Sequence, residues 1–382
     1  MKILGLIVEY NPFHTGHLYH LEKAQELVQP DLTVVIMSGN FVQRGEPAII
    51  DKWTRSAIAL DHAIDLVVEL PFVYAVQSAD YFASGAMKIL HDLHVTDVVF
   101  GSESGDITSF EAIAKTLQEK EDDYNQKVKE YMKQGYRYPN ACNQAIASLL
   151  HTSVTTPNDI LGLTYVKENL VHNYQIRMHC IKRTNDFHAT KKQRISSATA
   201  LRLAIQKNED VSNQVPSYKQ YQHPIFLEQL FPYLKYKILT TTTHDLQQLH
   251  LVEEGLENVL KKHIGNVDSM SALIQQVTSK RYTQGRIQRM LIHIALNNTK
   301  DSVKQAVPVD YIRILGMNKI GQAYLHSIKK TNVVPCITTF SSHQHPALTL
   351  EMQAAYVYGC LCKNPNAAIK KEYSQIPIIK NR

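Results

Sequence analysis

Four short apolar runs rich in β-branched residues recur along the first hundred residues, at positions 3–8, 32–37, 65–70 and 97–100. Their starts are separated by about 30 residues, which is the length of a strand–helix–strand unit. The runs are continuous and do not alternate with polar residues, as expected for strands that are buried on both faces. The pattern therefore predicts a parallel sheet that is covered by helices on both sides.

Segments with helical periodicity lie between these strands. Residues 16–28, for example, place Leu18, Leu21 and Ala24 on one face. Further helices are predicted at 51–64, 78–93, 143–150, 160–170 and 198–205, solvated helix and loop at 118–140, and a fifth strand at 175–181. Together the elements predict an α/β fold with a doubly wound, parallel, five-stranded Rossmann-like sheet.

The second half of the chain is expected to be mostly α-helical. Beyond Lys207 it shows few strand signals and no repeat of fixed period. We therefore predict two domains, over 1–205 and 206–382, with a boundary that falls between 205 and 225. The predicted helices lie at 225–239, 246–264, 270–276, 282–296, 309–315, 321–328 and 348–361.

The composition of the 382 residues, 44% hydrophobic and 20% charged, is that of a globular protein and excludes wholesale disorder. No run reaches the roughly 18 apolar residues of a membrane span, so we expect no membrane attachment. The first strand runs into Glu9 without a small-residue cleavage site, which is not the pattern of a signal peptide. Five scattered cysteines fit a reducing compartment. We therefore predict a cytoplasmic protein, and no feature points to an obligate protein partner.

The two halves differ in charge. The first 205 residues contain 20 Lys and Arg against 23 Asp and Glu, whereas the last 177 contain 21 against 12. A basic second half is a candidate for contact with a polyanion. A soluble surface with an excess of basic residues is the alternative.

The turn after the first strand carries the first chemical signal, Glu-Tyr-Asn-Pro-Phe-His-Thr-Gly-His at 9–17. Pro12 cannot extend a strand, and Gly16 lets the backbone approach a ligand closely. His14 and His17 are three residues apart at a helix N-terminus, where free N–H groups and the helix dipole favour anions. Two imidazole donors here predict a phosphate site in which His14 and His17 are catalytic, because they hold the negative charge that develops on the phosphoryl oxygens.

Two other interpretations of these histidines stay open. They could cap the helix or lie at the surface, or His14 and His17 could join His20 in a metal site. The strand–turn–helix context favours the phosphate site. No cysteine or carboxylate stands at an obvious ligand spacing, so we expect no metal that is bound directly by the protein.

A second signal is Ile-Ser-Ser-Ala-Thr-Ala-Leu-Arg at 195–202, which follows a basic loop containing Lys191 and Lys192. Ser196 and Ser197 stand at a predicted helix start, where hydroxyl and free N–H groups bind phosphate. The basic side chains of the loop could close over it. An ordinary serine cap beside a solvated loop is the alternative.

Both signals resemble motifs of known families. The His-Thr-Gly-His sequence resembles the [T/H]xGH signature of the HIGH nucleotidyltransferase superfamily, and 195–202 resembles its ISSTxIR motif, with Ala198 in place of the usual Thr. The segments at 5–17, 38–47 and 157–162 narrow the resemblance to the bacterial tRNA(Met) cytidine acetate ligase family. The resemblance is dense over residues 1–205.

This resemblance implies an enzyme that forms acetyl-adenylate and pyrophosphate from ATP and acetate. It then transfers the acetyl group to N4 of the wobble cytidine of elongator tRNA(Met). ATP, with Mg²⁺, and acetate are thus the expected small ligands, and elongator tRNA(Met) is the expected partner.

The resemblance also places the ATP-binding positions. They are Ile7, Val8, Glu9, Tyr10, Asn11, Pro12, Phe13, His14, Thr15, Gly16, His17, Leu18, Tyr19, His20, Gly101, Asn158 and Arg183, with Ser196 and Ser197 from the second motif. Gly101 would leave room for adenosine, Asn158 offers a donor and an acceptor, and Arg183 can fork onto phosphate. A turn glycine, a helix cap and a surface arginine are the alternatives for these three.

Other charged residues are weaker candidates. Arg44 and Lys52 could reach the triphosphate or acetate, or lie solvated at the surface. Glu9 and Asp51 could hold Mg²⁺ through water, although helix capping also explains Asp51.

Clustered cations in the second half are candidates for RNA contact. They are Arg281, Arg286, Arg289, Lys329 and Lys330, to which the loop adds Lys191 and Lys192. Phosphate contacts position RNA, and an unstacked base needs an aromatic surface such as Tyr282. A solvated face explains each of these cations equally well.

Two rival functions share some of these features. An adenylyltransferase of a phosphorylated small molecule, such as pantetheine phosphate or nicotinamide mononucleotide, would have the same nucleotide site but no need of a basic helical extension. A non-catalytic RNA-binding protein would not need His14, Gly16 and His17.

Overall fold

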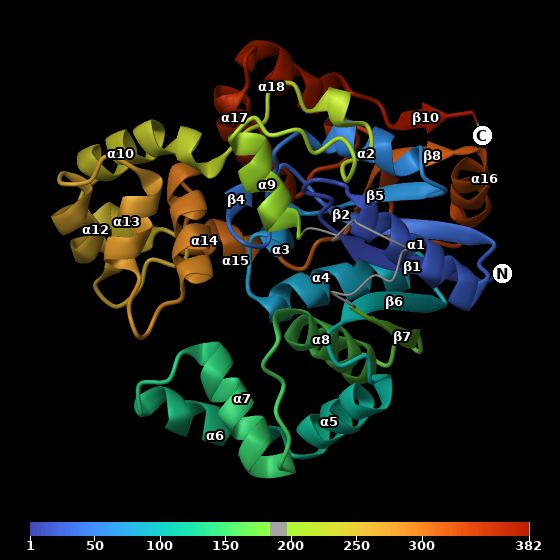
Figure 1. Cartoon of the computed structure of the whole chain (residues 1–382), viewed down its shortest axis with the longest axis horizontal. Coiled ribbons are helices and arrows are strands. Elements are labelled where there is room, and N and C mark those ends of the chain that lie inside the picture. Colours follow the sequence, from blue (N-terminus) through green and yellow to red (C-terminus); the bar gives the residue numbers. More distant parts are fainter. Residues whose placement is uncertain (184–196, 382) are drawn as a thin grey trace.

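Five strands of the main sheet are those that the sequence predicts. The computed structural model describes residues 1–183 and 197–381, and its main sheet has the order β10-β8-β5-β2-β1-β6-β7, with β9 beside β8 (Figure 1). The predicted strands are β1 (Ile3–Val8), β2 (Leu32–Ser38), β5 (Leu66–Leu70), β6 (Asp97–Ser102) and β7 (Arg177–Lys182). These five are parallel, which confirms the predicted fold class.

Helices cover both faces of this sheet. One core cluster joins Leu4, Leu6, Val35 and other side chains of one face to α1 (Thr15–Val28) and α2 (Lys52–Leu60). A second cluster joins the alternate strand residues to α3 (Phe72–Ala75), α4 (Ala79–Asp92) and α8 (Pro157–Val171). Successive strand residues point to opposite faces, so both faces of the continuous apolar runs are buried. The sheet is therefore doubly wound.

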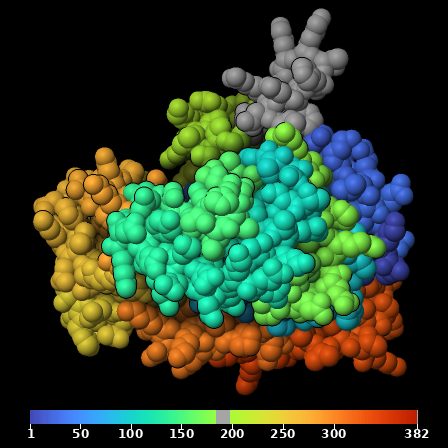
Figure 2. All heavy atoms as spheres, turned by 90° about the horizontal axis from the view of Figure 1, so that it is seen from below, coloured from blue at the N-terminus to red at the C-terminus, as the bar shows by residue number. Residues whose placement is uncertain are grey.

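Three helices extend from the second face of the sheet. They are α5 (Ile107–Glu119), α6 (Glu121–Lys133) and α7 (Tyr138–Leu150), and α6 occupies the charged segment. Val128, Ala141 and Ala145 form a small core of their own between α6 and α7. In the space-filling view, these residues occupy the middle of one face, beside the yellow and orange helical part of the chain (Figure 2).

A helical part follows α9 (Ala198–Gln206) and forms one end of the molecule (Figure 1). Its elements are η1 (Tyr218–Gln220), η2 (Leu227–Leu230), α10 (Phe231–Thr240), α11 (Thr243–Gln248), α12 (Leu256–Ile264), α13 (Met270–Val277), α14 (Gln284–Ala295) and α15 (Lys300–Gln305). None of the helices in the described part of the chain is long and apolar enough to cross a membrane.

The helix predicted at 309–315 is wrong, because this segment forms strand β8 (Ile312–Asn318). β8 pairs antiparallel with β5, and β10 (Ile378–Lys380) and β9 (Cys336–Ile337) pair with β8. The main sheet thus has eight strands and not five. All positions of β8 are buried, and a short apolar run without alternation does not distinguish a buried strand from a buried helix.

The last part of the chain also adds helices to the sheet. They are α16 (Lys319–Ile328), η3 (Phe340–Ser342), α17 (Pro346–Leu361) and α18 (Pro365–Ser374). Residues 312–380 therefore return to the sheet formed by the first half. The domain boundary at residue 205, with ATP binding before it and RNA binding after it, stays a prediction.

A buried cluster of charges joins this last part to the sheet, and it includes Lys52. The Lys52 ammonium lies 2.6 Å from both Glu69 and Glu372, and Arg313 contacts the same two carboxylates. Glu351 lies beside them, and burial next to Glu69 raises its pKa well above the usual value. Lys52 is 1% exposed and therefore cannot reach a triphosphate, so the interpretation of Lys52 as a phosphate or acetate contact is wrong.

A short hairpin connects the sheet to the helical part. Strands β3 (Phe41–Val42) and β4 (Glu46–Pro47) pair antiparallel, and Gly45 between them has φ of +79°. A Cβ atom at Gly45 would lie 2.3 Å from the backbone nitrogen of Arg289 in α14. Both the backbone conformation and this close approach require glycine.

Candidate nucleotide-binding site

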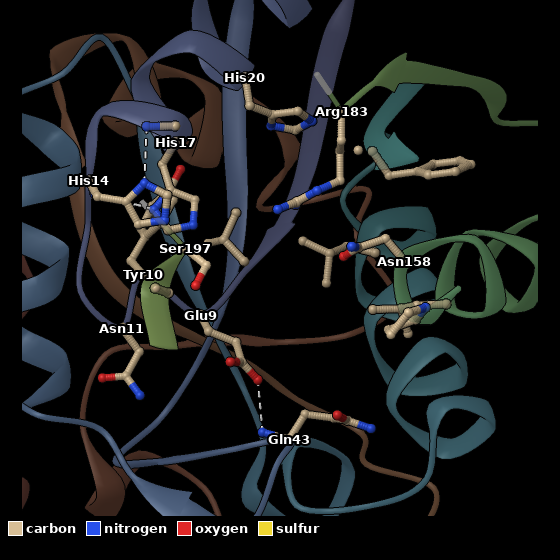
Figure 3. A pocket seen from close by; sticks show the side chains of 18 of the residues that line it. Glu9, Tyr10, Asn11, His14, His17, His20, Gln43, Asn158, Arg183 and Ser197 are labelled. Atoms are coloured by element: carbon tan, nitrogen blue, oxygen red, sulfur yellow. Dashed lines mark hydrogen bonds between the residues drawn. The ribbon is translucent and has the colours of Figure 1, made fainter. Parts of the chain in front are cut away.

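A cavity of about 480 Å³ lies where the carboxyl ends of β1, β6 and β7 meet the starts of α1, α8 and α9 (Figure 3). This edge is where open parallel sheets bind ligands, because the loops that leave the strands converge there. Most residues that the sequence predicted for ATP line the cavity: Ile7, Val8, Glu9, Tyr10, Asn11, His14, Gly16, His17, Tyr19, His20, Gly101, Asn158, Arg183 and Ser197. Pro12, Phe13, Thr15 and Leu18 do not, and Ser196, Lys191 and Lys192 lie outside the described residues.

Phe13 supports the site from behind. Its ring is fully buried and stacks on His17, with 5.9 Å between ring centroids, while Tyr10 contacts the same imidazole edge-on at 5.0 Å. The two aromatic rings fix the orientation of His17. Tyr10 also lines the cavity, whereas Phe13 does not.

His14 and His17 each use one ring nitrogen to cap helix α1. The Gly16 N–H donates to Nδ1 of His14 at 3.0 Å, and the His14 N–H donates to Nδ1 of His17 at 3.3 Å. Since Nδ1 accepts in both rings, the proton of each neutral imidazole is on Nε2. The ring centroids are 3.9 Å apart, so the two Nε2–H groups serve the same region. The capping interpretation is correct and is compatible with a second role as donors.

Burial keeps these imidazoles neutral near pH 7. It lowers the pKa of His14 and of His20 to about 4, and the positive charge of Arg183 acts in the same direction. The pKa of His17 is also well below its usual value, because of burial and the neighbouring His14. Nε2 of His20 is buried without a hydrogen-bond partner in the described part of the chain. A neutral imidazole still donates one hydrogen bond, which suits an anionic ligand.

Arg183 and Asn158 lie across the cavity from the paired histidines (Figure 3). The stem of Arg183 crosses Gly101, since a Cβ atom there would lie 3.4 Å from Cγ of Arg183. The space at Gly101 is therefore used partly by Arg183, whereas the sequence suggested room for adenosine. Asn158 donates through its side chain to Glu103, which leaves its carbonyl oxygen as an acceptor.

Asp159 fixes the loop that follows β6. Its carboxylate accepts from the backbone N–H groups of Glu103 and Ser104 and from the Ser102 hydroxyl. These hydrogen bonds hold the pKa of Asp159 below its usual value, although burial opposes them. The network ties the start of α8, and with it Asn158, to the end of β6.

Ser197 begins α9, and its Oγ accepts from the Ala200 N–H at 3.2 Å. Arg202, one helical turn further, donates to the Asn11 carbonyl and to Glu46, each at 2.8 Å. It therefore connects α9 to the turn after β1 and to the hairpin. Arg202 occupies the last position of the ISSTxIR-like motif, and this position in the motif could have predicted its role from the sequence.

The comparisons with known proteins agree with this geometry. Residues 1–373 match the family described as HIGH Nucleotidyl Transferase. The tRNA(Met) cytidine acetate ligase of Geobacillus sp. (strain WCH70) is 39% identical over 100% of both chains. That of Bacillus subtilis (strain 168) is 40% identical over 99% of this chain and 97% of the relative. The chain belongs to the tRNA(Met) cytidine acetate ligase family.

A solved structure in this family has the same fold. The crystal structure of Thermotoga maritima TmcAL bound with α-thio ATP matches with a TM-score of 0.90 and 34% identity over 100% of both chains. The apo crystal structure of the same protein matches with a TM-score of 0.91. The family resemblance predicted from the sequence is thus confirmed along the whole chain.

Several residues that line the cavity of the present protein were not predicted as ATP-binding positions. They are Gln43, Arg44, Phe82, Phe100, Pro157, Leu161, Tyr165, Ile181, Lys182, Ala198, Thr199 and Arg202. Arg44 was a weaker candidate, and the structure places it at the cavity. Most of the others come from helix faces or strand ends whose neighbours are set by the tertiary fold, so no local motif marks them. Asp51, by contrast, caps α2 and pairs with Lys371 at 3.0 Å.

Those predicted RNA-binding cations that the structure describes do not form one patch. Arg281 pairs with Glu254, and Arg286 pairs with Glu253 and covers the Tyr282 ring at 4.7 Å. Arg289 donates to the Gln43 carbonyl, and burial lowers its pKa to about 10.

Lys329 and Lys330 are exposed at the end of α16. Helix α16 lies at one end of the long axis, whereas α14 lies toward the other (Figure 1). The two lysines are thus separated from the arginines of α14, and RNA contact by both groups requires a ligand that extends along the molecule.

Proposed function

We propose that this protein is an ATP-dependent ligase that acetylates N4 of the wobble cytidine of elongator tRNA(Met). ATP and acetate first give acetyl-adenylate and pyrophosphate, and the acetyl group then passes to the cytidine amine with release of AMP. Full-length similarity to relatives named tRNA(Met) cytidine acetate ligase carries this proposal. The paired Nε2–H groups of His14 and His17 at the cavity support its first step.

In the first step, the protein mainly positions groups and stabilises charge. An acetate oxygen attacks the α-phosphorus in line, and pyrophosphate leaves with the electron pair. His14 and His17 donate from Nε2 to phosphoryl oxygens, where negative charge builds up. Ser197, Arg183 and Arg202 line the same cavity and add donors. Donors that are already oriented need no rearrangement when the charge develops.

Mg²⁺ enters this proposal as the companion of the triphosphate. The described residues contain no group of three or more His, Cys, Asp or Glu side chains that could hold a metal ion. The cavity therefore fits Mg²⁺ that is bound chiefly by phosphate oxygens and water, which is the usual way in which Mg²⁺ binds with nucleotides. When bound, the ion would neutralise charge on the leaving pyrophosphate.

The second step needs an activated acyl group, because free acetate is a poor acyl donor. The adenylate supplies a good leaving group, and a closed cavity limits its loss to water. The helical part and the last part of the chain hold the excess of positive charge and are proposed to bind the tRNA. The expected cytoplasmic location and the absence of an obligate protein partner remain predictions.

Isotopically labelled acetate tests the proposal directly. The protein, ATP and tRNA(Met) are incubated with the labelled acetate, and the tRNA is digested and analysed by mass spectrometry. We expect label in N4-acetylcytidine at the wobble position only, and only when ATP is present. Label in no nucleoside, with ATP consumption that instead depends on a phosphorylated small molecule, would contradict the proposal and favour the adenylyltransferase alternative.

A further inference from the structure

Glu9 is the only acidic residue among the described residues that line the cavity. The basic residues of the lining are Arg44, Lys182, Arg183 and Arg202. The basic side chains suit a triphosphate, whereas a carboxylate repels one. Glu9 is therefore suited to a part of the ligand that donates a hydrogen bond or carries a positive charge.

The Glu9 carboxylate is held in a fixed position. Glu9 directly follows β1, and one of its oxygens accepts from the Gln43 N–H at 2.8 Å (Figure 3). The Gln43 side chain donates to the Gln77 carbonyl at 3.1 Å, and Arg289 of α14 donates to the Gln43 carbonyl at 3.3 Å. The Gln43 hydrogen bond engages Oε1 and leaves Oε2 for a partner in the cavity.

Two aromatic side chains line the same cavity as this carboxylate. Phe82 of α4 and Tyr165 of α8 line the same cavity and are each 3% exposed. Tyr165 is close enough to Glu9 for the carboxylate charge to raise the pKa of the phenol further, beyond the effect of burial. Flat apolar side chains beside a polar acceptor are the surroundings that an unstacked nucleobase prefers.

The charges around Glu9 are mixed. Burial raises its pKa, and Glu46 of the hairpin acts in the same direction, whereas the Gln43 N–H, Arg202 and Arg44 lower it. Arg55 of α2 donates to the Glu9 carbonyl at 2.7 Å. A carboxyl whose pKa lies above the usual value is a better proton acceptor near neutral pH than an exposed one.

The second reaction step has a proton to remove. The exocyclic amine of cytidine is a weak nucleophile, because its lone pair is delocalised into the ring, and it becomes acidic as it bonds to the acyl carbon. His14 and His17 do not meet this need, since Nδ1 of each ring is occupied and Nε2 carries the proton. Within the described lining, Glu9 is the one carboxylate that can accept.

We propose that Glu9 accepts the proton from the N4 amine of the acceptor cytidine as that amine attacks acetyl-adenylate. This inference rests on the proposed function. The N4–C bond forms, the bond between the acyl carbon and the phosphate oxygen breaks, and AMP leaves with the electron pair. The N4 proton goes to Oε2 of Glu9 and then to solvent. Glu9 is then a catalytic residue of the transfer step, besides forming part of the wall of the nucleotide cavity.

Glu9→Gln tests this assignment. Glutamine keeps a carbonyl oxygen for the Gln43 N–H but cannot take a proton. We expect transfer from synthetic acetyl-adenylate to tRNA(Met) to fall by about 100-fold or more, which is the lower end of a general-base contribution. Adenylation, measured as acetohydroxamate formed from ATP, acetate and hydroxylamine without tRNA, should fall by about tenfold at most, because glutamine keeps the hydrogen bond from the Gln43 N–H and the shape of the cavity wall. Glu9→Asp should recover part of the transfer rate.

The pH profile separates proton transfer from a structural effect. We expect the wild-type transfer rate to rise with pH through the titration of Glu9, and this rise should be absent in Glu9→Gln. Glu22→Gln makes the same chemical change at an exposed site on α1 and should match the wild type in both assays. Thermal unfolding of each variant verifies folding.

Two results would overturn the assignment. Unchanged transfer by Glu9→Gln would exclude a role in proton acceptance. An equal loss of acetohydroxamate formation, reversed by higher Mg²⁺, would place Glu9 in ATP or Mg²⁺ binding instead. Failure of the proposed function is distinct from both, since the wild-type protein would then form neither acetohydroxamate nor acetylated tRNA.

Discussion

At the scale of single residues, the account depends on His14 and His17 serving two purposes at once. Each imidazole caps helix α1 through Nδ1 and thereby fixes its proton on Nε2. The cap determines which nitrogen carries the proton, and as a result each ring presents an N–H donor to the cavity. A histidine suits both purposes, because one ring nitrogen accepts at the cap while the other donates into the cavity.

Replacing His14 separates the two purposes. Asparagine is a good N-cap residue, whereas alanine is a poor one and costs about 1 kcal/mol of stability. We expect His14→Asn to unfold like the wild type and His14→Ala to be less stable. Both should lower acetate-dependent release of pyrophosphate by about 100-fold, the usual cost of one lost oxyanion donor. His244→Ala, at an exposed histidine of α11, is the matched control. Full activity of His14→Asn would show that the imidazole serves only as a cap.

ATP binding should take up protons at mildly acidic pH. Burial and Arg183 lower the pKa of His14 and His20 to about 4, so both are mostly neutral at pH 5. Phosphate charge nearby favours the protonated form of His20, whose Nε2 has no hydrogen-bond partner in the described part of the chain, whereas a proton on Nδ1 of His14 would break the helix cap. Calorimetry at pH 5 in buffers of different ionisation enthalpy should therefore report net proton uptake, which falls to zero by pH 8. Proton release at pH 5 would contradict the placement of phosphate beside these rings.

At the scale of elements, α9 is held against the β1 turn by Arg202. Its guanidinium makes two hydrogen bonds, to a backbone carbonyl and to a carboxylate, from a largely buried position. A side chain that links three segments at a cavity sets the position of everything else on its helix, including Ser197.

Removal of Arg202 should weaken ATP binding. Charge-assisted hydrogen bonds contribute about 1.5–3 kcal/mol each, so the loss of one such bond predicts at least a tenfold rise in the dissociation constant of ATP for Arg202→Ala. Arg177→Ala is the control, because Arg177 also pairs with a carboxylate, Asp97, but at the start of β6 and β7. Equal ATP affinity of Arg202→Ala and Arg177→Ala would exclude this role.

Element patterns in the sequence predicted the five parallel strands and most helices, because each strand of a doubly wound sheet is a continuous apolar run. They failed at β8, where the run at 309–315 is equally compatible with a buried helix. What decides between the two is the free edge of β5, which lies some 240 residues earlier in the chain and leaves no local trace.

The residues of the site likewise divide into those that local motifs predict and those that the tertiary fold brings together. His14, Gly16, His17 and Ser197 belong to local motifs and were predicted to share a cavity, which they line. Gln43, Tyr165 and Phe82 reach the cavity through the packing of distant elements, so spacing along the chain does not reveal them. Lys52 was misjudged because its partners Glu69 and Glu372 come from two distant segments of the chain.

At the scale of the whole molecule, the buried charge cluster fastens the last seventy residues to the sheet. Lys52 and Arg313 lie among Glu69, Glu351 and Glu372 with all five side chains almost fully buried. Removing one member leaves an opposite charge unpaired in the interior, which is expensive.

Arg313→Met should destabilise the fold by about 3–5 kcal/mol, the usual cost of breaking a buried ion pair. Urea unfolding measures this as a shift of the midpoint. Lys23→Met breaks the exposed pair with Glu26 and should leave the midpoint unchanged. A midpoint for Arg313→Met equal to that of the wild type would show that the cluster does not hold the last part of the chain in place.

The most direct test of the central claim is a crystal structure of this protein with a non-hydrolysable ATP analogue. The account predicts that Nε2 of His14 and Nε2 of His17 both lie at hydrogen-bond distance, about 2.7–3.2 Å, from phosphate oxygens. It also predicts that both Nδ1 atoms keep their backbone partners. A triphosphate bound elsewhere in the cavity, with both rings beyond contact, would contradict the claim.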